Sequence, residues 1–143
     1  MDQAQLTAGA TVAAATSFID PLPAQYEAPV EQSGKNFSGG QRQRLNIARA
    51  AVPDADILVL DDATSAVDQT TNAAIQAQLT KTRRQRTTVI ISQRVTNIMH
   101  CDEILVLEEG RITAAGSHDA LIKQSPFYAQ LVQTQLGGGR YDD

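Results

Sequence analysis

Helix-like and strand-like stretches of apolar residues alternate along the 143-residue chain. The Ala-rich residues 2–19 predict a helix that Pro21 ends, because proline lacks the N–H that a helix interior needs. Residues 24–37 contain two further disruptors, Pro29 and Gly34, and predict a loop. The chain therefore opens with a helical region that irregular backbone separates from the rest.

The clearest helix start lies at Ser38. Gln41 follows it by three residues, which is a capping-box pattern, and Pro53 stops the predicted helix. Residues 56–61 then form a short apolar run that ends in two acids. A strand that is apolar on both faces is typical of a parallel sheet, so we expect both faces of this strand to be covered.

The second half of the chain repeats this alternation. The patterns predict a helix over 69–82, strands over 87–92 and 103–107, a turn at Glu109-Gly110 into 111–113, and short helices over 94–100, 117–123 and from Pro126. The basic residues between Lys81 and Arg86 are expected to form a solvated helix end. Strands that alternate with helices predict an α/β fold.

Composition narrows the class of protein. Twelve basic and sixteen acidic residues give a formal charge of −4, which argues against a nucleic-acid-binding protein. Cys101 is the only cysteine, which excludes a disulfide framework and a cysteine-based zinc site and favours a reducing compartment. No stretch of the sequence approaches the ~18 consecutive apolar residues that span a bilayer.

Two acidic residues, Asp61 and Asp62, directly follow the apolar strand. We expect them at the carboxyl end of a parallel strand, where ligands of open α/β sheets bind. In phosphoryl-transfer sites one such carboxylate holds Mg²⁺, and a neighbouring acid orients the attacking water. The alternative is that two acids simply end the strand and face solvent.

Residues 36–50, NFSGGQRQRLNIARA, combine two glycines with the start of a helix. Glycines let backbone N–H groups approach an anion, Ser38 adds a hydroxyl, and the helix N-terminus adds a partial positive charge. A capped helix with flexible glycines is the alternative interpretation. The acidic strand end and residues 64–68, TSAVD, follow in order, and this combination favours nucleotide binding.

This ordered set resembles the ATP-binding cassette of exporter-type ABC transporters. The similar segments, in chain order, are the stretch before the signature (18–26), the signature motif FSGGQ (37–41), Walker B ILVLDD (57–62), the D-loop SAVD (65–68), the switch strand TTVIISQRV (87–95), and the closing strands and helix DEILVLEEGRI and GSHDAL (102–121). The resemblance covers about residues 10–136. Several motifs in a fixed order make it more specific than any one of them.

The resemblance implies roles for two sets of residues. In the chain's own site, the residues that would hold Mg²⁺ through water, position the attacking water and contact the γ-phosphate of ATP are Asp61, Asp62 and Gln93, respectively. The residues that would grip the γ-phosphate of the ATP on a partner cassette are Ser38, Gly39, Gly40 and Gln41, and the residue that would bridge the cassettes is Asp68. ATP and Mg²⁺ are the expected ligand and cofactor.

One motif of the family is missing, because no Walker A sequence, G-x-x-x-x-G-K-[ST], occurs in the chain. The family places Walker A upstream of the signature, so the resemblance implies a truncated, C-terminal part of a nucleotide-binding domain. Its partial P-loop NTPase fold would have a mostly parallel core sheet with flanking helices. The expected parts are a partial helical subdomain (1–52), the later ATPase core (53–136) and a flexible tail (137–143). The isolated chain is expected to bind ATP poorly and to be inactive.

The residues of the chain's own site also depart from the family. The family's catalytic Glu is Asp62 here, and the missing methylene retracts the carboxylate by about 1.5 Å. A misplacement of about 1 Å can cost about 10²-fold in rate. The family's switch histidine is Gln93, which can donate a hydrogen bond but cannot become cationic. With its signature intact, the chain resembles the weaker-site subunit of a heterodimeric exporter.

The resemblance also implies partners and a location. The partners would be a second nucleotide-binding domain and the transmembrane domains of an exporter, on the cytoplasmic side of the membrane, with no nucleic acid. ATP hydrolysis would then drive export. One alternative is a non-enzymatic fragment of a split or truncated gene that cannot bind ATP alone. Another is a cassette ATPase outside transport, in DNA repair or translation, for which no basic groove is evident.

Overall fold

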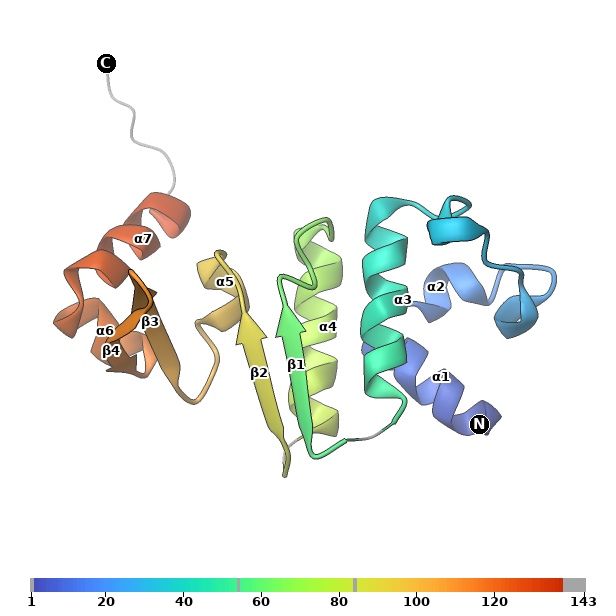
Figure 1. Cartoon of the computed structure of the whole chain (residues 1–143), viewed down its shortest axis with the longest axis horizontal. Coiled ribbons are helices and arrows are strands. Elements are labelled where there is room, and N and C mark those ends of the chain that lie inside the picture. Colours follow the sequence, from blue (N-terminus) through green and yellow to red (C-terminus); the bar gives the residue numbers. More distant parts are fainter. Residues whose placement is uncertain (1, 54, 84, 138–143) are drawn as a thin grey trace, which may run out of the picture. The chain divides into compact units, whose positions relative to one another are not determined.

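The computed structural model describes residues 2–53, 55–83 and 85–137, which form two compact units with a boundary after Ile91 (Figure 1). The elements of the first unit, in chain order, are α1 (Gln3–Val12), α2 (Thr16–Ile19), 3-10 turns at Gln25–Glu27 and Gln32–Gly34, α3 (Gly39–Ala51), β1 (Ile57–Asp61), α4 (Gln69–Thr82) and β2 (Thr87–Ile91). The mixture of helices with a small parallel sheet confirms the predicted α/β class.

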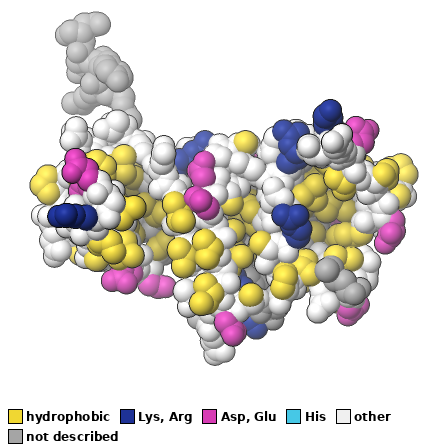
Figure 2. All heavy atoms as spheres, in the orientation of Figure 1, with side chains coloured by type: hydrophobic (Ala, Val, Ile, Leu, Met, Phe, Trp, Pro, Cys, Tyr) yellow, Lys and Arg dark blue, Asp and Glu magenta, His cyan; other side chains and the backbone are white. Residues whose placement is uncertain are grey.

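Strands β1 and β2 form the parallel pair that the sequence predicts. Their register runs from Ile57 opposite Thr87 to Asp61 opposite Ile91. Side chains alternate along β1, so Leu58 is buried while Ile57 is 62% exposed. Hydrophobic side chains accordingly gather on the surface over these strands (Figure 2). Among the described residues one face of the pair is bare, and the expectation that both faces are covered is not met.

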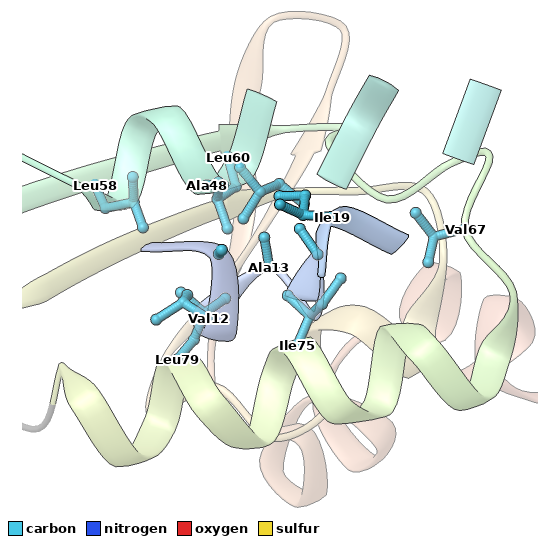
Figure 3. Packing of buried hydrophobic residues seen from close by; sticks show 12 residues of the cluster. Val12, Ala13, Ile19, Ala48, Leu58, Leu60, Val67, Ile75 and Leu79 are labelled. Carbon is cyan, nitrogen blue, oxygen red and sulfur yellow. The ribbon is translucent and has the colours of Figure 1, made fainter. Parts of the chain in front are cut away.

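The other face of β1 packs against the core of the first unit (Figure 3). Helix α4 contributes its buried stripe from one side, and α1, α2 and α3 contribute theirs from the other. The labelled side chains that converge there are Val12, Ala13, Ile19, Ala48, Leu58, Leu60, Val67, Ile75 and Leu79. This packing fixes α3 and the β1–α4 connection, the two segments that carry the signature and the acidic residues, in one unit.

The single helix predicted over residues 2–19 is instead two helices. Ala14 has a positive φ of 52°, which ends α1 and lets the chain turn into α2. Flanking Ala13 and Ala15 are fully buried, and the Arg44 guanidinium donates to the Ala14 carbonyl at 2.9 Å. Tertiary packing therefore overrides the helix propensity of the Ala-rich stretch.

The prediction of a solvated helix end between Lys81 and Arg86 is wrong at Arg83, and Arg84 lies outside the described residues. Arg83 is only 8% exposed. Its guanidinium donates to the carbonyls of Ala55 at 2.8 Å and Thr87 at 3.3 Å, and to the Thr88 hydroxyl at 3.1 Å. Carbonyl groups at the starts of β1 and β2 accept hydrogen bonds from this buried cation. They take the place of the water that would otherwise solvate it.

The second unit contains α5 (Val95–Ile98), β3 (Ile104–Glu108), β4 (Arg111–Gly116), α6 (His118–Gln124) and α7 (Pro126–Leu136). Strands β3 and β4 pair antiparallel, and the predicted Glu109-Gly110 turn joins them with positive φ at both residues. The buried hydrophobic cluster of the second unit is small. Its described members are Ile104, Val106, Leu121 and Tyr128. The predicted tail lies outside the described residues apart from Gly137.

Candidate functional site

The two acidic residues lie where the parallel strands end. Asp61 is the last residue of β1, opposite Ile91 of β2, and the Asp62 N–H donates to the Ile91 carbonyl at 2.9 Å. Both acidic side chains are exposed. Asp62 has a positive φ of 45°, a conformation that costs free energy for any residue with a Cβ. No pattern in the sequence predicted this strain.

This edge suits a magnesium ion that is shared with a phosphate. Mg²⁺ in phosphate-transfer sites takes one or two carboxylates and completes its shell with water and phosphate oxygens. Asp61 and Asp62 offer such carboxylates. Within residues 2–53, 55–83 and 85–137, no group of three His, Cys, Asp or Glu side chains could hold a metal by itself. Two carboxylates leave the other coordination positions of such an ion to water and phosphate oxygens.

The N-terminus of α3 carries the predicted capping box. Ser38 Oγ accepts from the Gln41 N–H at 3.2 Å, and Gln41 Oε1 accepts from the Ser38 N–H at 2.9 Å. As a bond acceptor, the Ser38 hydroxyl still has its own proton to donate. Gly39 and Gly40 begin the helix, where backbone N–H groups have no acceptor within the helix. This end can therefore donate hydrogen bonds to an anion.

Gly40 also has a packing role that its sequence context did not indicate. A Cβ on this residue would lie 2.9 Å from the Ala66 carbonyl oxygen, whereas a Cβ on Gly39 would meet the Ala66 Cβ at 3.9 Å and the end of the Arg42 side chain at 4.0 Å. The first turn of α3 thus lies directly against the β1–α4 connection. Both the start of α3 and the carboxyl end of β1 lie toward the same side of the first unit (Figure 1).

Gln43 joins the same two segments through its side-chain amide. Its Nε2 donates to Ser65 Oγ at 2.7 Å, and its Oε1 accepts from the Ala66 N–H at 2.7 Å. Sequence reasoning missed this residue, because its partners lie more than twenty positions away and no local pattern marks them. The signature helix and the connection that carries Asp62 are consequently held together.

Asp68 lies at the end of this connection and caps α4. Its carboxylate accepts from the Thr71 N–H at 2.9 Å and from the Thr71 hydroxyl at 2.8 Å. The backbone bond from Thr71, and then its hydroxyl, hold the pKa of Asp68 below its ordinary value. The side chain is exposed and charged at neutral pH, so it can both cap the helix and meet a partner.

Gln93 lies in the second unit, on the turn between Ile91 and α5, and its side chain is exposed. Ser92 Oγ accepts from the Arg94 N–H at 3.1 Å and from Asn97 Nδ2 at 2.9 Å. The remaining predicted site residues, which lie together in the first unit, are Ser38, Gly39, Gly40, Gln41, Asp61, Asp62 and Asp68.

Comparison with known proteins shows what this chain is similar to. The ABC transporter family matches residues 6–65. An ATP-dependent lipid A-core flippase of Shewanella sp. strain MR-4 is 44% identical over 133 residues, 93% of this chain and 22% of the flippase. The flippase of Haemophilus influenzae strain 86-028NP is 41% identical over 134 residues, 94% of this chain and 23% of that protein.

A solved structure agrees with these relatives. A bacterial Atm1-family ABC exporter with ATP bound superposes with a TM-score of 0.88 and 38% identity, over 94% of this chain and 24% of the exporter. The chain spans less than a quarter of the length of either flippase. In the part of the chain that the structure describes, no helix is both long and apolar enough to cross a membrane.

Proposed function

We propose that this chain, which is similar to ABC exporters, works within the nucleotide-binding domain of an exporter as the later part of its ATP-binding cassette. ATP binding and hydrolysis there would drive substrate export. The observation that carries the proposal is the capped, glycine-containing start of α3, held against the connection between Asp62 and Asp68. The anion-binding helix end suits a phosphate of one ATP, and the acidic strand end on the same side of the unit suits the Mg²⁺ of another.

The signature residues would act on ATP that a partner cassette holds. The N–H groups of Gly39 and Gly40 and the hydroxyl of Ser38 would donate hydrogen bonds to the γ-phosphate, and Gln41 would hold Ser38 in place through the capping box. The exposed Ser38 and the partly exposed Gly39 and Gly40 are accessible to such an ATP. Asp68 would bridge the two cassettes from the adjacent connection.

The acidic edge would serve ATP bound by this cassette itself. Asp61 would hold Mg²⁺ through water, which neutralises charge on the phosphates, and Asp62 would orient the attacking water. Gln93 would donate a hydrogen bond to the γ-phosphate. The short Asp62 carboxylate and the uncharged Gln93 support slow hydrolysis here, as in the weaker-site subunit of a heterodimeric exporter.

The proposal includes partners and a location. A second nucleotide-binding domain would complete each ATP site, and transmembrane domains would pass the substrate. Lipid A-core flippases and an Atm1-family exporter, which this chain resembles, support an exporter context. The chain would act on the cytoplasmic side of the membrane.

The proposal is tested in mixed dimers of the Shewanella flippase, in which this chain replaces the matched segment of one subunit. We expect Gly39→Asp in this chain to abolish ATP hydrolysis at the unaltered subunit's site, because a carboxylate would face the γ-phosphate. The structure has room for a Cβ at Gly39, so folding should persist. The control Asp62→Asn should leave that site active. Equal activity of the two variants would contradict a signature that acts in trans.

One observation favours the alternative of a fragment that cannot bind ATP alone. The bare face of β1 and β2 exposes Ile57, Val59, Val89 and Ile91, and the sequence holds no Walker A lysine. Titration calorimetry of the chain with Mg-ATP should therefore show no micromolar binding. Micromolar binding by the chain alone would refute this account, whereas an inactive mixed dimer would favour the fragment over the exporter.

A further inference from the structure

The turn that presents Gln93 is held by a side chain from the last helix. Gln135 of α7 accepts from the Val95 N–H through Oε1 at 2.8 Å and donates to the Gln93 carbonyl through Nε2 at 2.8 Å. The Gln135 amide thus binds the N–H of Val95 and the carbonyl of Gln93, the residues that follow and precede Arg94. Among side chains that stay uncharged, only Asn and Gln supply a strong acceptor and a strong donor on one rigid planar group.

The backbone of the turn is also bonded at Arg94, whose carbonyl accepts from the Asn97 N–H at 3.1 Å. Helix α5 begins only at Val95 and is four residues long. On the other side, the Ser92 hydroxyl accepts from the Arg94 N–H and from Asn97. The Gln93 backbone lies between these two fastenings, while its side chain is exposed. Ser92 and Gln135 therefore both help to set the direction in which Gln93 leaves the backbone.

From this geometry we propose that Gln135 is a positioning residue for Gln93, and that α7 sets the placement of the γ-phosphate contact. The inference rests on the proposed function for the role of Gln93, but the clamp itself does not. Gln135 is the penultimate residue of α7 and is exposed, so core packing does not account for its two contacts. A displacement of this helix end would move the Gln93 backbone directly.

The clamp is tested by amide hydrogen exchange of the complete 143-residue chain. Gln135→Ala removes both hydrogen bonds, so exchange at the Val95 N–H should accelerate by about 10-fold. Gln135→Glu keeps the acceptor, so Val95 should stay protected while the Gln93 carbonyl loses its donor. The matched control is Gln133→Ala, an exposed glutamine on the same helix. Unchanged Val95 exchange in Gln135→Ala would overturn the inference.

The positioning role is tested by ATP hydrolysis in flippase dimers in which both subunits carry this chain. Gln135→Ala should lower kcat several-fold with little change in KM for ATP, and Gln133→Ala should change neither. In a Gln93→Ala background, Gln135→Ala should have no further effect, because the group that it positions is gone. Additive losses would show a merely structural role and overturn the inference. An inactive parent dimer would count against the proposed function, while the exchange measurement would still decide the clamp.

Discussion

The two segments that carry candidate catalytic residues are held in different ways. The connection from Asp62 to Asp68 in the first unit has a helix cap at one end, the Gln43 amide in the middle and the close approach of Gly40 beside it. The Gln93 turn in the second unit relies on the hydroxyl of Ser92 and the amide of Gln135. The close approach of Gly40 ties the first segment to the packing of its unit, whereas Gln135, which ties the second segment to α7, is exposed.

Because of this difference, we expect substitutions in the first segment to affect mainly stability and substitutions in the second to affect mainly the placement of Gln93. The first unit has an extensive buried cluster that includes α4 and β1, whereas the buried cluster of the second has four members. Changes around the first segment disturb packing and should appear mainly as lost stability. Changes at the Gln93 turn remove hydrogen bonds at the surface and should appear mainly as lost rate. The following variants test whether this division holds.

The largest effect is expected from Arg83→Met. The carbonyls of Ala55 and Thr87 would lose their charged donor, and a hydrogen bond to a charged group contributes about 1.5–3 kcal/mol. We expect the free energy of unfolding to fall by about 2–4 kcal/mol in urea titrations. Exposed Lys81→Met is the control and should change it by less than about 0.5 kcal/mol.

Amide hydrogen exchange measured in both units of the Arg83→Met chain tests whether the two units unfold separately. Protection should fall at β1 and β2, which Arg83 joins, and persist at Val95 in the second unit. A parallel loss of protection in both units would show that they unfold as one cooperative body, and the proposed division between them would then be wrong.

A second test compares the two signature glycines. Gly40→Ala would force its methyl group against the Ala66 carbonyl oxygen, and such overpacking costs about 1–3 kcal/mol. Gly39→Ala would meet side-chain atoms of Ala66 and Arg42 at ordinary distances and should change the free energy of unfolding by less than about 0.5 kcal/mol. Thermal or urea unfolding of both variants measures the difference. Equal costs would mean that α3 does not press on the connection.

Local signals in the sequence were sufficient for most helices and strands. The Ser38 cap, the helix over residues 69–82 and the parallel strand are each encoded by neighbouring residues, and the structure confirms them. The break at Ala14 and the burial of Arg83 depend on distant packing, so propensity could not predict them. The amide clamps join residues 22–23 and 40–42 positions apart, and no periodic pattern marks such pairs.

A smaller effect of opposite sign is expected at the acidic edge. Asp62 has a positive φ, which glycine adopts without strain, so Asp62→Gly should raise the free energy of unfolding by about 0.5–1 kcal/mol. Asp61 lies in β1, where glycine is unfavourable, so Asp61→Gly should lower it by a similar amount, about 0.5–1 kcal/mol. Urea unfolding distinguishes the two. Destabilisation by both would show that Asp62 has stabilising contacts that outweigh its strained backbone.

The smallest effect concerns the charge of Asp68. Its pKa is lower in the folded chain, because the Thr71 N–H and hydroxyl bind the carboxylate. The carboxylate therefore stabilises the fold above the unfolded pKa of about 3.9, and this contribution is lost as the pH falls through the folded pKa.

Thr71→Val tests this local origin, because it removes the hydroxyl but keeps the N–H that caps α4. We expect the pKa of Asp68 to rise part of the way toward its ordinary value, as measured by carbon NMR titration of its carboxyl group. Asp68→Asn should remove the dependence of stability on this titration, so its stability relative to the parent chain should improve as the pH falls below about 4. An unchanged pKa in Thr71→Val would mean that the Thr71 N–H alone lowers the pKa of Asp68. The Thr71 hydroxyl would then not help to fix this end of the connection.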